Sequence, residues 1–276
     1  MLKALRLFVL GLVIGILTLS CCGARPLTPA GRADLLDGDT VALTHSWRGD
    51  SHVFCSAVFV SPSVMVTAEH CVKGLAHRIA QEKAIDAGAD VMAVALGVAE
   101  LPKIEPEEIS LSFMFKGEVT TLSGEPSGVH QSKVLALGVD SDLALLQAIN
   151  PDMLPKHTFA RLAAETPSVG EKVFIVGHPH GLYWTHTEGN VAAYRGDMND
   201  PGEEVDPVMV GPFLQVDAAV WKGNSGGGAF NERGELIGIC SFTVGVPNTA
   251  FFVHLDSIKA IMKDAHLIKM DLSSKK

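Results

Sequence analysis

The chain has 276 residues, of which 47% are hydrophobic and 19% are charged, so it can bury a substantial core. This composition argues against extended disorder. The formal net charge of -9 argues against a nucleic-acid-binding protein, which would carry a basic surface.

The first residues have the pattern of a secretory signal. Lys3 and Arg6 precede an unbroken apolar run from Leu7 to Leu17. This run is shorter than the about 20 apolar residues that are needed to span the hydrocarbon core of a bilayer. We therefore expect residues 1–22 to direct export and to be removed, which places the mature protein in the periplasm or at the cell surface.

The end of this segment also resembles a bacterial lipoprotein signal. The small residue Ser20 stands directly before Cys21, which in such a signal carries lipid, becomes the mature N-terminus and anchors the protein to the membrane. An ordinary cleaved signal or an uncleaved anchor is the alternative. Residues 23–34 are then expected to be a linker, and residues 35–276 to form one folded domain.

The remainder of the chain has the pattern of an all-β protein. Short apolar runs are separated by Gly, Pro, Asn and Asp, and about a dozen such strands suit a sandwich or paired barrels. Among the predicted strands are Val53–Val60, Lys133–Gly138, Leu143–Ile149, Lys172–Val176, Phe213–Val220, Gly228–Phe230, Glu235–Ser241 and Ala250–Leu255. Two segments are predicted to be helical instead, Ala76–Ala87 and Leu255–Ala265.

The cysteines allow one disulfide in the folded domain if the protein is exported. If Cys21 and Cys22 belong to the export segment, three cysteines remain for the folded domain. One disulfide is then permitted, and Cys55 and Cys71 are the natural pair because their bond would close a loop over one hairpin. Cys240 is then a free thiol in an apolar strand, where a cysteine most often packs as a small hydrophobic residue.

The segment Lys222–Gly228 is the clearest candidate for chemistry. Glycines on both sides of Ser225 allow the backbone to turn sharply and to approach a substrate closely. Such a turn can direct the amides of Gly223 and Ser225 at one point, which forms an oxyanion hole for a tetrahedral intermediate. A glycine-rich hairpin with an incidental serine is the alternative.

A histidine and an aspartate stand at the ends of two other apolar segments. His70 follows the segment Val64–Ala68, and a strand end is a rigid support for a general base. Asp142 directly precedes a strongly apolar strand, where a half-buried carboxylate can accept the Nδ1 proton of a histidine and fix its tautomer. Asp140 is the competing candidate, but only Asp142 adjoins the strand directly.

Together, these segments resemble the three catalytic motifs of trypsin-like serine peptidases. The segments are Thr67–Cys71, Asp142–Leu146 and Gly223–Gly227, which read T-A-E-H-C, D-L-A-L-L and G-N-S-G-G. Within this class the chain is most similar to bacterial Htr-type proteases, through Val173–Pro179 and Leu214–Val220.

The resemblance, which extends from about Val41 to Ile261, implies a fold and a mechanism. The implied fold is all-β, with two six-stranded Greek-key β-barrels and a short C-terminal helix. The implied function is a serine endopeptidase that cleaves exported or extracellular proteins through an acyl-enzyme. In this reaction Ser225 is the nucleophile, His70 the general base and Asp142 its orienting carboxylate. No metal or organic cofactor is required.

Some positions follow the family pattern and others depart from it. Cys55 and Cys71 stand where classical trypsin relatives have the disulfide that braces the histidine loop. Glu69 stands where relatives usually have a small residue, and a second carboxylate beside His70 would favour the charged base and move activity to more alkaline pH. Htr proteases usually carry a C-terminal peptide-binding module, which we do not expect here.

Two other functions are compatible with parts of the sequence. Gly223–Gly227 also fits the G-x-S-x-G pattern of α/β-hydrolase esterases, but that fold needs an acid and then a histidine downstream of the serine. Only His254 and His266 follow Ser225, and both are near the terminus. The second alternative is a trypsin-like fold that has lost catalysis and binds a partner, which the presence of all three triad residues disfavours.

The primary specificity pocket is expected between the segment before Ser225 and the strand that follows it. By resemblance, Ala219 lies near the base of this pocket, whereas Ser241 and Phe242 line the other wall and pair with substrate backbone. No acidic residue occupies that base, so a small or medium apolar side chain is predicted there rather than Lys or Arg.

The expected partners are protein or peptide substrates and, through a lipid on Cys21, the membrane. No nucleic acid partner is expected, and the sequence does not define the oligomeric state. His178 and His180 invite comparison with a zinc site, but Pro179 between them breaks the required geometry. We therefore expect loop histidines and no metal.

Overall fold

The computed structural model describes residues 27–47, 50–116, 118, 128–138, 140–196 and 211–267. The predicted export segment and its lipidation candidate Cys21 lie outside these residues. Within the described part of the chain, no helix has both the length and the apolar character that crossing a bilayer requires.

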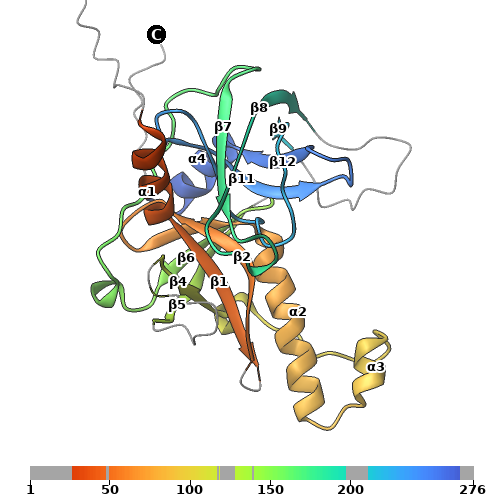
Figure 1. Ribbon diagram of the computed structural model, residues 1–276. Coiled ribbons are helices and arrows are strands. Elements are labelled where there is room, and N and C mark those ends of the chain that lie inside the picture. The colour runs from red at the N-terminus through yellow and green to blue at the C-terminus, as the bar shows by residue number, and fades with distance from the viewer. Residues whose placement is uncertain are drawn as a thin grey trace, which may run out of the picture.

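The described strands form two closed antiparallel barrels of six strands each, which confirms the predicted fold class (Figure 1). The strand order is β1-β2-β3-β6-β5-β4 in the first barrel and β10-β11-β12-β9-β8-β7 in the second. The first barrel consists of β1 (Thr40–Trp47), β2 (Asp50–Phe59), β3 (Val64–Thr67), β4 (Ser110–Met114), β5 (His130–Leu137) and β6 (Ala144–Ala148). The second consists of β7 (Lys172–Gly177), β8 (Thr185–Arg195), β9 (Phe213–Val216), β10 (Gly228–Phe230), β11 (Leu236–Thr243) and β12 (Ala250–His254).

Strand β3 is apolar at successive positions because both of its faces are buried. Met65 belongs to the core of the first barrel, whereas Val64 and Val66 belong to a cluster shared with the second barrel. Side chains of a strand alternate between faces, so a continuous apolar run is what burial on both sides requires. The strand that leads to His70 is thereby packed on one face against the core of its own barrel and on the other against the cluster shared with the second barrel.

Helix α4 (Leu255–Asp264) closes the second barrel, as the sequence predicted. Leu255, Ile258, Ile261 and Met262 are buried, at the three- and four-residue spacing of one helix face. At its start the His254 ring accepts a hydrogen bond at Nδ1 from the backbone N–H of Asp256, at 3.1 Å. This bond satisfies one of the free amides of the first turn.

Helix α1 (Pro29–Asp39) begins inside the segment that was predicted to be a linker. Thr28 caps it by accepting a hydrogen bond from the Gly31 N–H at 3.1 Å, and Pro29 occupies the first turn. Leu36 is fully buried in the cluster between the barrels. The helix lacks a continuous apolar stripe, but the Thr-Pro pair is a helix-start signal that the sequence did offer.

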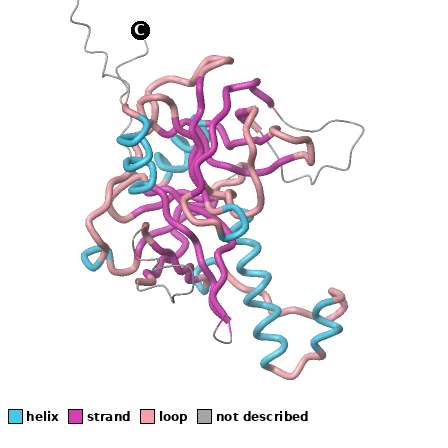
Figure 2. The backbone as a smooth tube through the Cα atoms, viewed as in Figure 1, coloured by secondary structure: helices cyan, strands magenta, loops and turns pink. Residues whose placement is uncertain are grey.

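Helix α2 (Glu69–Asp86) extends the predicted helix toward the N-terminus, because Ala76–Ala87 is only its outer part. It projects away from both barrels and ends beside α3 (Val91–Ala95) (Figures 1 and 2). Three short turns of 3-10 helix complete the described elements: η2 (Pro106–Glu108), η3 (Pro151–Met153) and η4 (Pro179–Gly181). The earlier start of α2 matters because it places His70 in the first turn of a helix rather than in a loop.

Two carboxyl groups at the end of α1 are buried to a similar extent but have different partners. Burial alone would raise the pKa of Asp37, but His186 and Lys116 hold it below its usual range. The His186 Nε2 atom lies 2.6 Å from an Asp37 oxygen, and the Lys116 ammonium donates to the other. Asp39, 1% exposed, has no cationic partner of this kind among the residues that the structure describes. Its burial raises the pKa to about 6, a shift that the Thr158 hydroxyl opposes only in part.

Asp39→Asn is expected to stabilise the protein at pH 8 and to have little effect at pH 4. The folded pKa of about 6 lies above the ordinary value of 3.8, so the folded state loses stability as the pH rises from about 4 through 6. The difference between these two pKa values corresponds to about 3 kcal/mol in the free energy of unfolding. Urea unfolding at pH 4, 6 and 8 measures it, with the exposed Asp34→Asn on the same helix as the control. An equal effect of Asp39→Asn at all three pH values would contradict this prediction.

Candidate active site

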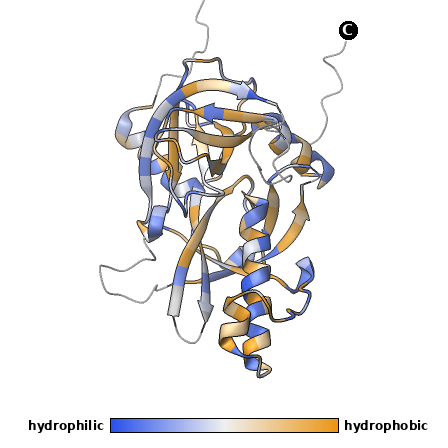
Figure 3. Cartoon of the chain, turned by 90° about the vertical axis from the view of Figure 1, so that its right-hand side faces the viewer, coloured by the Kyte–Doolittle hydropathy of each residue, from blue (hydrophilic) through white to orange (hydrophobic). Residues whose placement is uncertain are grey.

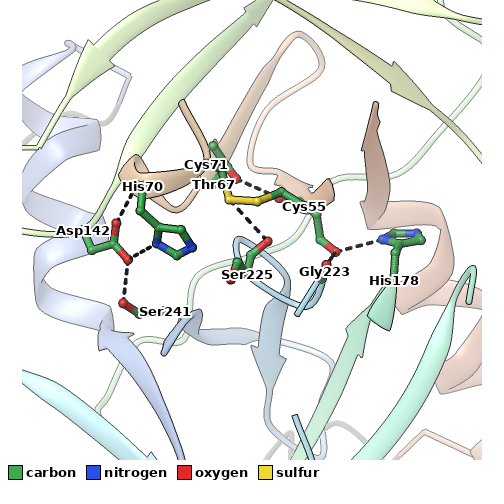
Figure 4. Close-up of a disulfide and its surroundings, with 10 residues drawn as sticks. Cys55, Thr67, His70, Cys71, Asp142, His178, Gly223, Ser225 and Ser241 are labelled. Carbon is green, nitrogen blue, oxygen red and sulfur yellow. Dashed lines mark hydrogen bonds and ion pairs between the residues drawn. A yellow bond between two sulfur atoms is a disulfide. The ribbon is translucent and has the colours of Figure 1, made fainter. Parts of the chain in front are cut away.

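One carboxylate holds both the backbone and the ring of His70. The His70 Nδ1 atom lies 2.8 Å from Asp142 Oδ2, and the His70 backbone N–H donates to Asp142 Oδ1 at 2.8 Å (Figure 4). His70 is the second residue of α2, so its N–H is one of the donors that a helix start leaves unpaired. Asp142 therefore caps α2 and orients the imidazole at the same time.

A third donor fixes the Asp142 carboxylate. The Ser241 hydroxyl, at the end of β11, donates to Asp142 Oδ2 at 2.5 Å. Burial alone would raise the pKa of Asp142, but the bonds from His70 and Ser241 hold it below its usual range. Since an ionised carboxylate only accepts hydrogen bonds, His70 carries its proton on Nδ1 and has Nε2 available to accept another.

Asp140, the competing acid in the sequence, is placed elsewhere. It has a φ of 52° and lines a cavity between β5 and α4. The geometry therefore pairs His70 with Asp142 and not with Asp140.

The turn that carries Ser225 is attached to both barrels. The Ser225 carbonyl accepts a hydrogen bond from the Ser56 N–H of the first barrel at 2.8 Å, and the Gly226 N–H donates to Cys240 of the second barrel at 2.8 Å. Gly226 has a φ of 80°, and a Cβ there would collide with the Ser56 carbonyl and the Thr67 hydroxyl. Only glycine permits this approach, which holds Ser225 where the barrels meet.

Two amides of this turn are available to an oxyanion. Within the described residues, the N–H groups of Gly223 and Ser225 have no hydrogen-bond acceptor, whereas those of Asn224, Gly226 and Gly227 bond to backbone carbonyls. Gly223 has a φ of 103°, a conformation that favours glycine. The turn thus combines a serine with two unpaired N–H donors that are two residues apart, on either side of the bonded Asn224 N–H.

A buried hydroxyl and a buried histidine support the Gly223 peptide, and the sequence analysis missed both roles. The Ser56 hydroxyl donates to the Gly223 carbonyl at 2.8 Å and lies 2.8 Å from His178 Nδ1. Because its single proton is used on Gly223, the His178 ring must donate to Ser56. His178 is fully buried, and burial lowers its pKa to about 3, which keeps it neutral.

The sequence placed His178 in a loop and gave it no role in the site. It follows β7 in irregular backbone, as predicted, but it is 0% exposed and lies on the far side of Ser225 from His70 (Figure 4). One signal was available in the sequence, since Ser56 is a lone hydroxyl within the apolar segment Val53–Val60.

Cys55 and Cys71 form the disulfide that the sequence predicted, and Cys240 is free and buried. The bond joins β2 to the first turn of α2 beside His70. The two sulfurs and the His70 ring lie within 4.8 Å of one another, but sulfurs joined in a disulfide are not thiolates and do not ligate a metal. For the same reason, the Cys71 Sγ that lies 3.8 Å from the Ser225 carbonyl is a contact and not a donor.

Residues 55–239 match the family model described as a trypsin-like peptidase domain. The chain belongs to this family. Among curated proteins, it is 39% identical over 109 residues to the "Periplasmic pH-dependent serine endoprotease DegQ" of Escherichia coli K12, which covers 39% of this chain and 22% of DegQ. It is 31% identical over 140 residues to a "Serine protease HtrA-like" protein of Staphylococcus aureus USA300, covering 48% of this chain and 18% of that protein. The chain thus spans only about a fifth of the length of these relatives.

Solved structures show the same fold. The HtrA-type protease AlgW, as a variant with a bound tripeptide, superposes with a TM-score of 0.57 at 19% identity over 86% of this chain and 63% of AlgW. The protease Rv3671c of M. tuberculosis H37Rv, in an inactive form, gives a TM-score of 0.56 at 15% identity over 88% of this chain and 96% of that one.

In this trypsin-like domain, a cavity that contains Ala219 adjoins the Ser225 turn. It has a volume of about 340 Å³ and is lined by Ala218–Lys222, Thr243 and residues 245–249. Ala219 is one of its lining residues, and its place at the base of the specificity pocket stays a prediction. Ser241 instead donates to Asp142, and the Phe242 ring stacks on Phe251 at 4.7 Å. The substrate-binding roles of Ser241 and Phe242 stay predictions.

The carboxylate of Glu69, next to His70 in sequence, already has a cationic partner. Its Oε2 accepts a hydrogen bond from the Lys73 ammonium at 2.8 Å, one helical turn along α2. The expectation that Glu69 would favour the charged form of His70 did not consider Lys73. An ion pair of this kind weakens the field of Glu69 at His70.

Proposed function

We propose that the chain is a serine endopeptidase that works through an acyl-enzyme. Ser225 Oγ attacks the carbonyl carbon of a peptide bond while its proton passes to His70 Nε2. The amides of Gly223 and Ser225 stabilise the oxyanion, and the C–N bond then breaks as His70 returns the proton to the leaving nitrogen. Water, activated by His70, hydrolyses the ester and restores Ser225.

The observation that carries this proposal is the double hydrogen bond between His70 and Asp142, in one cavity with Ser225. Both His70 and Ser225 line a hollow of about 340 Å³, and the close-up view shows the two residues as neighbours (Figure 4). The described residues contain no hydrogen bond between them, and such bonds are commonly long before substrate arrives. An esterase of the α/β-hydrolase class would instead need a largely parallel sheet, which the antiparallel barrels do not provide.

We assign the cavity beside Ala219 to the side chain that precedes the cleaved bond. Ala218, Ala219, Val220 and Trp221 supply apolar surface, and Lys222 is the only charged residue among the lining. A small or medium apolar side chain therefore fits better than Lys or Arg, which would need an acidic partner.

We also propose that residues 1–22 direct export, with Cys21 as a lipidation site. The disulfide between Cys55 and Cys71 suits an oxidising compartment, and the relative DegQ is described as periplasmic. The substrates would then be exported or extracellular proteins.

A fluorophosphonate probe tests the proposed nucleophile directly. We expect a covalent adduct on Ser225, located by mass spectrometry, that is lost in Ser225→Ala and strongly reduced in His70→Ala. His77→Ala, which changes another exposed histidine of α2, serves as the matched control and should label normally. Folded protein that takes up no probe would instead support an inactive binding scaffold.

A further inference from the structure

Two cavities lie next to each other along α2, and the first of them adjoins the Ser225 turn. The first, about 340 Å³, contains His70, Gly223 and Ser225. The second, about 520 Å³, lies between β1, α2 and α3. His45 and Arg78 line both of them. The cavities therefore form one groove, which runs from the reacting groups along α2, and we call it the α2 groove.

The position of His70 defines which part of a substrate the α2 groove receives. His70 lines this groove, whereas the residues around the Ala219 cavity do not include it. In the proposed reaction the base returns its proton to the leaving nitrogen, so the departing chain lies on the His70 side. The groove is thus placed for the segment that follows the cleaved bond.

The charges along the α2 groove favour an anion. Lys222 and Arg78 are exposed, and within the described chain neither side chain has an ion-pair or hydrogen-bond partner. Among the described residues that line the groove, the one carboxylate belongs to Glu82, and it is already bound to His45 Nε2 at 2.9 and 3.1 Å. Two unpaired cations thus lie beside Ser225 in a protein whose formal net charge is -9.

The outer end of the α2 groove is apolar. Ile85, Val91, Val94 and Ala95 form its wall, and Val91 is 61% exposed. Figure 3, coloured by hydropathy, shows hydrophobic positions on the projection that α2 and α3 form. A polypeptide that leaves the cations can continue along this surface and bury apolar area against it.

We propose that α2 and α3 form a specificity site for the substrate segment that follows the cleaved bond, in which Arg78 binds a carboxylate with support from Lys222. The carboxylate is either an acidic side chain or the C-terminus of the substrate, because both present the same two oxygens to a guanidinium. This inference rests on the proposed function for the direction of the chain, but the groove and its charges do not depend on catalysis.

Binding to the Ser225→Ala protein tests the inference without turnover. Amidated fluorescent peptides carry Glu or Gln in turn at successive positions after the cleaved bond, and a third set carries Gln with a free C-terminal carboxylate. We expect the Glu or free-carboxylate peptide to bind about three- to fivefold more tightly than the neutral peptide at its best position, the range of an exposed charge pair. The set that shows the difference identifies the source of the carboxylate.

The matched variants are Arg78→Gln and Lys83→Gln, which remove one positive charge each from the same helix, although Lys83 does not line the groove. Arg78→Gln should abolish the preference in binding and, with Ser225 restored, in kcat/KM, whereas Lys83→Gln should retain both. A preference that is absent, or that survives Arg78→Gln, overturns the inference. Failure of the proposed function is distinct: no turnover and no fluorophosphonate adduct, with the binding preference still present.

Discussion

Asp142→Asn is expected to lower kcat by about 10⁴-fold, the magnitude of the equivalent change in the trypsin triad, with a much smaller effect on KM. Asp142 Oδ2 accepts bonds from both His70 Nδ1 and the Ser241 hydroxyl. If an amide NH₂ occupies that position, it donates to Nδ1 and forces the imidazole proton onto Nε2. His70 then has no free lone pair directed at Ser225.

Asp140→Asn is the matched control for this prediction, because it makes the same chemical change two residues away in a different cavity. Its φ of 52° is one that asparagine tolerates. Steady-state hydrolysis of a peptide substrate and the rate of fluorophosphonate labelling should fall for Asp142→Asn alone. If Asp140→Asn lost activity and Asp142→Asn kept it, the assignment of the acid would be wrong.

Asp142→Asn should also change how stability depends on pH. The pKa of Asp142 in the folded protein is held below the ordinary value of 3.8. The ionised carboxylate therefore stabilises the fold above about pH 4, and this contribution is lost as the pH falls through the folded pKa. The variant lacks that contribution, so its free energy of unfolding should differ most from the parent at neutral pH.

The sequence predicted those parts of the molecule whose signal is local. Met65 and its neighbours in β3 form an unbroken apolar run because both faces of the strand are buried, and the run leads directly to His70. The glycines around Ser225 are required where they stand, since a Cβ at Gly226 would collide with the first barrel. Fold class, strand positions and the candidate triad could be read from such features.

The missed features depend on contacts between distant segments. Ser56 and His178 are 122 positions apart, and neither residue type indicates alone that it supports the Gly223 peptide. The helix start at Glu69 was missed because Ala68 provides no side-chain cap. Asp142, which lies in the bend before β6, supplies the acceptor. The α2 groove depends in the same way on His45 in β1 lying beside Arg78 in α2.

Ser56→Ala is expected to lower kcat by about 10- to 100-fold while KM changes little. The Ser56 hydroxyl holds the Gly223 carbonyl at 2.8 Å, and the N–H of the same residue is one of the two proposed oxyanion donors. Loss of an oxyanion donor outright costs about 10²–10³ in kcat, and a loosened donor should cost less. Because the oxyanion forms only in the transition state, binding of the ground-state substrate should be nearly unaffected.

Ser132→Ala separates this positioning effect from simple destabilisation. Ser132 is also fully buried, and its hydroxyl donates to the Leu111 carbonyl at 3.1 Å within the first barrel, away from the Ser225 turn. Each variant leaves a buried backbone carbonyl without its donor, so both should lower the free energy of unfolding by about 1–3 kcal/mol. Only Ser56→Ala should also lower kcat and slow fluorophosphonate labelling. An equal loss of activity in both variants would mean that Ser56 acts through stability alone, whereas full activity in Ser56→Ala would mean that the Gly223 peptide holds its orientation without the hydroxyl.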